Sequence, residues 1–329
     1  MTPHRASTAA VSFDLSDWSQ IDVSGTGAGA FLQNFCTNDL NALSPGQSCE
    51  TFFCDLKGRI LAHVQILNRD DSFRLLGVRG TAEVLVPHLR KYLLDAPVII
   101  EDRSRELGLL CLHGTGLQEI LQTATGMEIS LSSRETQDVE TAAGPLLIAA
   151  VELLSGLTWL VSGDRVAVAS LRERIPAQFL ELGARDLFEL LRIEGGYPHC
   201  GRDLTAQDIA QSAARTSRTI SFTKGCYLGQ EPIARLDAMG HTTRELRGLI
   251  IPGTQAQPTD GVFADGKDVG RVTTTAYSPA RSATLALAML RVQHAAPGTV
   301  LTVRTSTGDV SATVFWPTVD SISPESTAD

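Results

Sequence analysis

The last quarter of the chain constrains the fold more than any other region. From about Arg247 onward, short runs of β-forming residues recur roughly every 8–12 residues, separated by Gly, Pro and Asp turns. The predicted strands are 248–251, 261–263, 270–275, 284–290, 300–303 and 311–315. This spacing is typical of a small β-barrel. We therefore predict a barrel domain over 246–317 and a disordered polar tail over 318–329.

Residues 1–245 mix hairpins with helices. Their predicted strands are 21–23, 51–54, 59–67, 73–78, 97–101 and 109–112, and their predicted helices are 28–36, 82–94, 117–122, 164–182 (interrupted at Pro176) and 186–193. The apolar run 144–163 is broken by Glu152 and Gly156, so we interpret it as a buried hairpin and not as a membrane span. Antiparallel hairpins among helices indicate an α+β fold.

A relaxed dinucleotide-binding fingerprint lies near the N-terminus. Gly25, Gly27 and Ala30 follow a predicted strand and precede a predicted helix. The next segments are antiparallel strand runs without a parallel crossover, so the context of a nucleotide site is missing. We interpret the motif as a structural turn.

Composition and charge exclude several classes of protein. The chain has 43% hydrophobic residues and a net charge of −9, which argues against general binding of nucleic acid or anionic membranes. No secretory signal pattern is evident, so we predict a cytoplasmic monomer with reduced thiols. The six cysteines have no CxxC spacing, and no intrinsic metal is predicted. A site formed by His199, Cys200, Cys226 and His241 is the alternative, but their spacing is that of unrelated loop residues.

The segment 224–231, which reads KGCYLGQE, contains the strongest candidate site residues. Gly225 and Gly229 would let a partner approach the Cys226 thiol, and the charge of Lys224 would favour its thiolate form. Donors and acceptors follow in the order Gln230, Glu231 and Arg235. The alternative is that Cys226 is a small buried hydrophobic residue.

This octapeptide resembles the signature of the YgfZ-type folate-binding proteins, relatives of the glycine-cleavage aminomethyltransferase (T-protein) that include an iron–sulfur assembly factor. The resemblance continues through 220–223 and 240–249. The segment 192–198 is similar to the family's Arg-x-Glu-x-Gly-x-Pro pattern, and 31–40 and 58–59 resemble the start of the superfamily.

The resemblance implies a T-protein-like folate-binding fold with mixed and antiparallel sheets, in which 1–245 forms two interleaved subdomains. It implies tetrahydrofolate as cofactor and Cys226 with Lys224 as the functional pair. The implied folate contacts are Arg192, Glu194, Lys224, Tyr227, Gln230, Glu231 and Arg235. For Arg192, a structural role as a cation at a helix C-terminus is the alternative.

Three functions are compatible with these residues. The first is a tetrahydrofolate-binding accessory protein in the assembly, maintenance or repair of iron–sulfur enzymes, acting through Cys226 and contacting client proteins or assembly machinery. The second is a folate-dependent aminomethyltransferase. The third is a scaffold that has lost folate binding, because 209–212 reads IAQS where relatives commonly carry LPQE.

Overall fold

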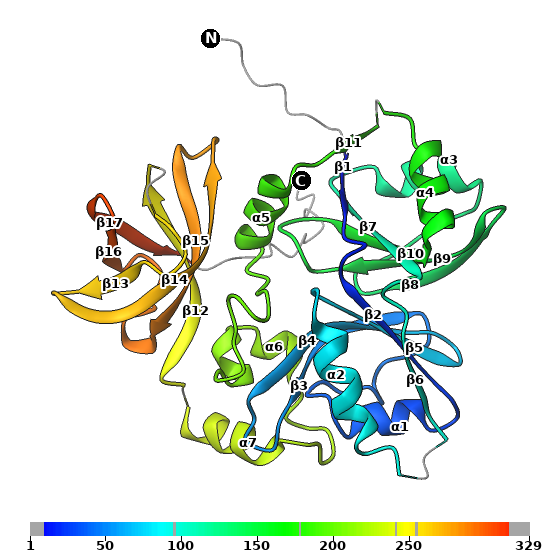
Figure 1. Ribbon diagram of the computed structural model, residues 1–329, viewed down its shortest axis with the longest axis horizontal. Coiled ribbons are helices and arrows are strands. Elements are labelled where there is room, and N and C mark those ends of the chain that lie inside the picture. Colours follow the sequence, from blue (N-terminus) through cyan, green and yellow to red (C-terminus); the bar gives the residue numbers. More distant parts are fainter. Residues whose placement is uncertain (1–9, 95–96, 178, 241, 254–255, 316–329) are drawn as a thin grey trace, which may run out of the picture.

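The computed structural model describes residues 10–94, 97–177, 179–240, 242–253 and 256–315. Two sheets and a barrel form the fold (Figure 1). The first sheet is antiparallel, with strand order β3-β4-β5-β2-β6. Its strands are β2 (Ser19–Ser24), β3 (Gln47–Cys54), β4 (Ile60–Asn68), β5 (Ser72–Gly77) and β6 (Ile99–Asp102).

The second sheet has the strand order β11-β1-β7-β10-β9-β8. Its strands are β1 (Ala10–Asp14), β7 (Leu107–His113), β8 (Thr136–Thr141), β9 (Gly144–Val151), β10 (Thr158–Asp164) and β11 (Leu180–Leu182). The pair β1–β11 is parallel and the other pairs are antiparallel. The predicted buried hairpin over 144–163 is confirmed as β9 and β10.

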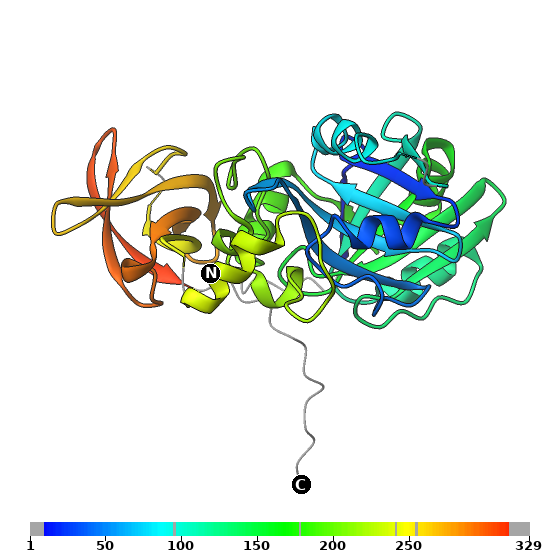
Figure 2. The same ribbon diagram turned by 90° about the horizontal axis from the view of Figure 1, so that it is seen from below.

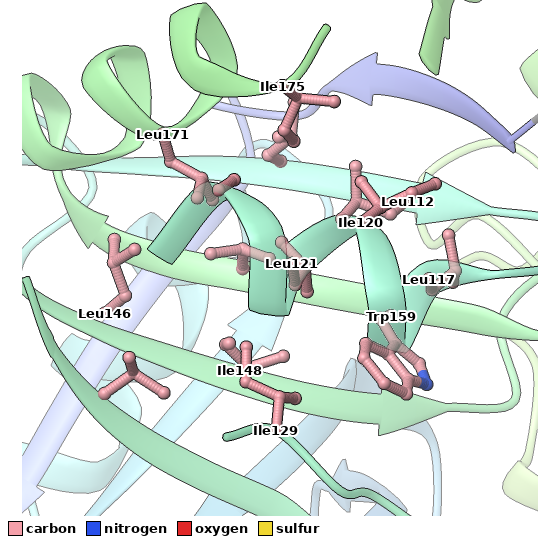
Figure 3. Close-up of a cluster of buried hydrophobic side chains, with 14 of the residues drawn as sticks. Leu112, Leu117, Ile120, Leu121, Ile129, Leu146, Ile148, Trp159, Leu171 and Ile175 are labelled. Carbon is pink, nitrogen blue, oxygen red and sulfur yellow. The ribbon is translucent and has the colours of Figure 1, made fainter. Parts of the chain in front are cut away.

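The two sheets pack face to face, and helices cover their outer faces. Because side chains alternate along a strand, β4 directs Val64 and Ile66 toward α1 (Ala28–Gln33) and α2 (Thr81–Arg90), and Leu67 toward the second sheet. On the far side, α3 (Leu117–Thr125) and α4 (Arg165–Arg174) bury Leu121 and Leu171 against β7, β9 and β10 (Figure 3). Each sheet is therefore buried on both faces.

A mainly helical segment joins the sheets to the barrel. It contains α5 (Arg185–Glu194), η1 (Ala210–Ala213), α6 (Thr216–Thr219) and α7 (Gln230–Met239). In Figure 2 this segment lies between the sheets at one end of the molecule and the barrel at the other. No helix in the described residues is both long and apolar enough to cross a membrane.

The predicted C-terminal barrel is confirmed. It is closed, with strand order β12-β15-β14-β13-β16-β17. Its elements are β12 (Arg244–Pro252), β13 (Gly261–Ala264), β14 (Lys267–Ser278), β15 (Ala283–Arg291), η2 (Val292–His294), β16 (Val300–Thr305) and β17 (Gly308–Phe315). The predicted tail, 318–329, lies outside the described residues.

Two predicted helices are wrong in part. The helix predicted over 164–182 ends at Arg174, and Leu180–Leu182 is strand β11, because pairing with β1 outweighs the local helical pattern after Pro176. The helix predicted over 28–36 ends at Gln33, and Cys36 instead forms a bridge to Phe53 at the edge of β3. Tertiary pairing at a sheet edge overrides local propensity in both places.

Candidate functional site

Cys226 lies on an exposed loop between α6 and α7. Its thiol is solvent-exposed, and in the described part of the chain it has no hydrogen bond or ion pair. Gly225 beside it is also exposed, and a Cβ added there would meet nothing within 4 Å. The interpretation of Cys226 as a buried hydrophobic residue is therefore wrong, and the thiol is accessible to a partner.

Lys224 is buried and holds this loop in place. Its Nζ donates to the carbonyls of Gln33 at 2.7 Å, Cys36 at 2.8 Å and Asn38 at 2.6 Å. The three ammonium donors are thus taken up by the end of α1 and the residues that follow. Burial lowers the pKa of Lys224, against the opposing influence of Cys36 and Asp39.

The thiol that lies against Lys224 is Cys36. Its Sγ is 3.7 Å from the Lys224 Nζ, and burial raises the pKa of Cys36 despite that neighbouring charge. The ammonium group of Lys224, which is close to Cys226 in the sequence, therefore donates its hydrogen bonds to residues 33–38. Lys224 is an anchor of the loop, because its donors face main-chain oxygens.

Gly229 fixes the other end of the loop. Its φ is +82°, and a Cβ there would lie 2.4 Å from the carbonyl oxygen of Asp55. The loop is also held by the main-chain hydrogen bond from Leu228 to Asn34, at 2.8 Å. Tyr227 is buried, with the Lys224 ammonium 5.0 Å from its ring centroid. These contacts leave Cys226 as the exposed point of a restrained loop.

The remaining residues of the motif lie at the start of α7. Gln230 is half-buried, whereas Glu231 and Arg235 are exposed on the helix surface. They flank the Cys226 loop along the chain and do not line the described cavities. Their position is that of surface residues beside the thiol.

Arg192 has its donors taken by the protein itself. It is buried, and it pairs with Asp203 at 2.7 Å and Glu189 at 2.8 Å. Asp203 in turn accepts hydrogen bonds from Thr273 and Thr274 of the barrel. Arg192 therefore connects α5 to the barrel, which agrees with a structural role. Four of its five N–H donors are used by Glu189, Asp203 and the carbonyl of Tyr197.

Glu194, two residues further along, is only half-buried. Its carboxylate lies 3.9 Å from Arg281, in the turn between β14 and β15. Burial raises the pKa of Glu194, and the charge of Arg281 opposes this shift. Glu194 is therefore a carboxyl group at the junction of α5 and the barrel, partly open to solvent.

A buried ionic cluster that the sequence reasoning missed lies between the sheets. Glu50 on β3 accepts hydrogen bonds from Arg215 at 2.5 and 2.6 Å and lies 2.6 Å from Nε2 of His63. Burial raises the pKa of Glu50, but Arg215 and then His63 outweigh it and hold that pKa below its usual range. The signal in the sequence was an ionisable residue within or beside each of the predicted strands 51–54 and 59–67.

Aromatic rings and unsatisfied polar atoms extend this cluster. The His63 ring lies between Phe52 and Tyr197, with ring centroids 4.6 Å away on each side. Its Nδ1, and Nε2 of Gln20 further along the same sheet face, are buried and have no hydrogen-bond partner in the described residues. Such atoms are expected to bind water or a ligand.

An aromatic cavity of about 270 Å³ lies next to this cluster. Phe13, Trp18 and Phe188 line it, and the Trp18 ring stacks with Tyr197 at 6.3 Å between ring centroids. Its charged lining residues are Asp14, Asp17, Arg79, Arg185 and Glu189. An apolar cavity with a few polar groups is the usual form of a small-molecule site.

No group of three or more His, Cys, Asp or Glu side chains is arranged to hold a metal ion among the described residues. The possible metal site weighed above includes His241, which lies outside them. Metal binding by Cys226 together with His199 and Cys200 therefore has no support from geometry.

Two sheets packed face to face beside a closed C-terminal barrel define the fold of the aminomethyltransferases. The structure matches the aminomethyltransferase T of the glycine cleavage system from Bartonella henselae with a TM-score of 0.84. The match covers 94% of this chain and 86% of that chain at 20% sequence identity. This likeness establishes the fold.

Sequence comparison establishes the family. The GCVT N-terminal domain model matches residues 4–224, and the glycine cleavage T-protein C-terminal barrel domain model matches 244–319. The chain therefore belongs to the glycine cleavage T-protein family, and the resemblance to its YgfZ-type relatives is confirmed.

Two kinds of relative match the chain at similar levels. A protein named tRNA-modifying protein YgfZ, from Colwellia psychrerythraea, is 27% identical over 76% of this chain and 74% of its own length. An aminomethyltransferase from Caldanaerobacter subterraneus is 29% identical over 90% of this chain and 80% of its own length. Sequence identity alone does not distinguish a YgfZ-like protein from an aminomethyltransferase, so the distinction depends on the site residues.

Proposed function

We propose that this protein binds tetrahydrofolate and serves as an accessory factor in the assembly, maintenance or repair of iron–sulfur enzymes. The observation that carries the proposal is the exposed Cys226 thiol, on a loop that Lys224 and Gly229 hold in place. An aminomethyltransferase that works on a carrier-bound amine needs no such thiol. The loop has the form expected for contact with a partner protein.

The residues around the aromatic cavity fit a folate. Phe13, Trp18 and Phe188 would hold its flat ring, and the carboxylate of Asp17 would accept hydrogen bonds from the ring's N–H edge. The exposed side chains of Arg79 and Arg185 would pair with glutamate carboxylates. Bound tetrahydrofolate would supply ring nitrogens that carry a one-carbon unit.

The folate contacts proposed here differ from those that the family resemblance implies. The donors of Arg192 and Lys224 are already used within the protein, so neither is included. Gln230, Glu231 and Arg235 are assigned to the surface around Cys226. Glu194 does not line the aromatic cavity, and its carboxyl group, partly open to solvent, is considered for the second candidate function below.

The chemistry assigned to Cys226 is thiol–disulfide exchange or transient contact with a cluster. In the exchange, the Cys226 thiolate attacks one sulfur of a partner's disulfide, and the other sulfur leaves as a thiolate. The step is reversed when the released thiolate attacks the partner's sulfur in the mixed disulfide, which re-forms the partner's disulfide and frees Cys226 as a thiolate. Exposure of the sulfur is the requirement that this loop meets.

Aminomethyl transfer is the second candidate function. Glu194 favours it, because a partly buried carboxyl group with a raised pKa suits proton transfer. Purified protein should then transfer a one-carbon unit to tetrahydrofolate, and Glu194→Gln should abolish that activity. Absence of any transfer would leave the accessory role.

Folate binding is tested by titrating purified protein with tetrahydrofolate and following tryptophan fluorescence or the heat of binding. We expect saturable binding that is weakened by Arg185→Gln, with Arg174→Gln, at the exposed end of α4, as the matched control. The same variants are then compared for rescue of a folate-linked [4Fe–4S] enzyme in cells lacking the native factor. Rescue without folate binding would identify a scaffold.

A further inference from the structure

The barrel has a cavity of its own where β12 begins and β15 ends. Its volume is about 560 Å³, and it is lined by Thr242, Thr243, Arg244, Arg291, Val292 and Gln293. The main-chain hydrogen bond from Val292 to Thr243, at 3.2 Å, closes this end of the strand pair. The cavity lies outside the aromatic cavity and the Cys226 loop, and it shares no residue with either.

Two arginines face each other across this strand pair. Arg244 on β12 lies directly opposite Arg291 on β15 in the antiparallel register, so both side chains project from the same face. Both are exposed at the cavity. Like charges directly opposite each other in a sheet are destabilising.

Within the described residues, neither arginine forms an ion pair. The adjacent carboxylate, Glu245, is one residue further along β12, so it projects from the other face, and it is paired with Arg247. By contrast, Arg304 of the same barrel has Asp309 as its partner at 3.2 Å. Arg271 on β14 of the same barrel also has no ion pair among the described residues, so what distinguishes Arg244 and Arg291 is that the two lie opposite each other at one cavity.

We propose that this cavity binds a phosphate group, held between Arg244 and Arg291. Two guanidinium groups on one face can each present a planar pair of donors to one oxyanion. Thr243 and Gln293 line the same cavity, and a hydroxyl and an amide are neutral hydrogen-bonding groups suited to a phosphate oxygen. A bound dianion would also offset the repulsion between the two arginines, which explains why the fold tolerates them opposite each other.

The proposal is tested by calorimetric titration of the full chain with inorganic phosphate, pyrophosphate and, separately, citrate. Ionic strength is held constant with chloride. We expect 1:1 binding of phosphate or pyrophosphate with a dissociation constant below about 1 mM. Each of Arg244→Gln and Arg291→Gln should weaken binding at least about tenfold, because each removes a charged fork.

Arg304→Gln is the matched control, since it removes an arginine of the same barrel that has a carboxylate partner. It should bind phosphate like the wild type. Phosphate should also raise the melting temperature of the wild type, but not that of the double variant Arg244→Gln/Arg291→Gln. Without phosphate, Arg291→Gln should melt at the same or a higher temperature than the wild type, because the like-charge pair is gone.

Equal phosphate binding by wild type and double variant would overturn the proposal, as would full competition by chloride. Binding of citrate without phosphate or pyrophosphate would overturn the assignment to phosphate. These outcomes do not depend on whether the aromatic cavity binds folate.

Discussion

The cluster between the sheets and the Cys226 loop each contain a buried cation whose donors are used within the protein. Only the loop also carries a thiol that is open to solvent. In the cluster, Arg215 is fully engaged with Glu50 and nearby main-chain oxygens. In the loop, Lys224 is engaged equally fully, yet Cys226 two residues later is open to solvent. The comparison separates two kinds of motif residue: Lys224 positions the loop, and Cys226 is available for chemistry.

Removing the charge in the buried cluster should have the largest effect. Arg215→Met leaves the Glu50 carboxylate buried with only His63 as a partner, so we expect a loss of about 3–5 kcal/mol in the free energy of unfolding. Urea denaturation measures it. Arg69→Met, which breaks a more exposed pair with Asp138, should cost less than about 1 kcal/mol. Similar losses for the two variants would contradict the importance of burial.

Removing Lys224, the anchor of the Cys226 loop, should have the second largest effect on the free energy of unfolding. Lys224→Met leaves three buried carbonyl groups without their donor, and we expect a loss of about 1.5–3 kcal/mol. Cys226→Ser, at an exposed site, should change stability by less than about 0.5 kcal/mol. Both are measured by the same denaturation experiment. An anchor role for Lys224 fails if its variant is as stable as the wild type.

The two glycines of the motif offer a sharper comparison within one loop. Gly229→Ala forces a Cβ against the Asp55 carbonyl oxygen at φ +82°, so we expect a loss of at least about 1–2 kcal/mol. Gly225→Ala meets nothing within 4 Å and should cost less than about 0.5 kcal/mol. Thermal unfolding of the pair measures the difference. Equal melting temperatures would show that Gly229 is not constrained by close packing.

Substituting Glu194 should have the smallest effect on stability, and this effect should depend on pH. Because burial raises its pKa, the folded state favours the protonated carboxyl group, and the resulting stability is lost as pH rises through the folded pKa. Glu194→Gln keeps the neutral form, so at pH 7 it should be slightly more stable than the wild type, by less than about 1 kcal/mol. The difference should vanish below the unfolded pKa. The opposite trend would mean that Arg281 dominates.

The barrel strands and most hairpins were predicted from local patterns, whereas α7, β8 and the elements ordered by distant partners were not predicted. All six barrel strands were predicted, because turn residues separate each of them. Strand β11 was missed, since its three residues are ordered by pairing with β1.

In the candidate site, too, local features could be predicted from the sequence and contacts between distant residues could not. Exposure of Cys226 follows from its glycine neighbours, which the sequence displays. The contacts of Lys224 and the pairing of Arg215 with Glu50 could not be inferred, because each joins residues more than 160 positions apart. Arg192 is the converse case: its place in a family motif predicts a ligand contact, whereas in the structure Asp203 and Glu189 are its partners.

The most direct test of the central claim compares Cys226→Ser with wild type for rescue of a folate-linked [4Fe–4S] enzyme in cells lacking the native factor, at matched protein levels. Cys200→Ser, at a partly buried thiol, is the control. The account predicts that Cys226→Ser folds and binds tetrahydrofolate normally but fails to restore the enzyme, while Cys200→Ser restores it. Full rescue by Cys226→Ser would contradict the claim that the exposed thiol is the working group of this loop.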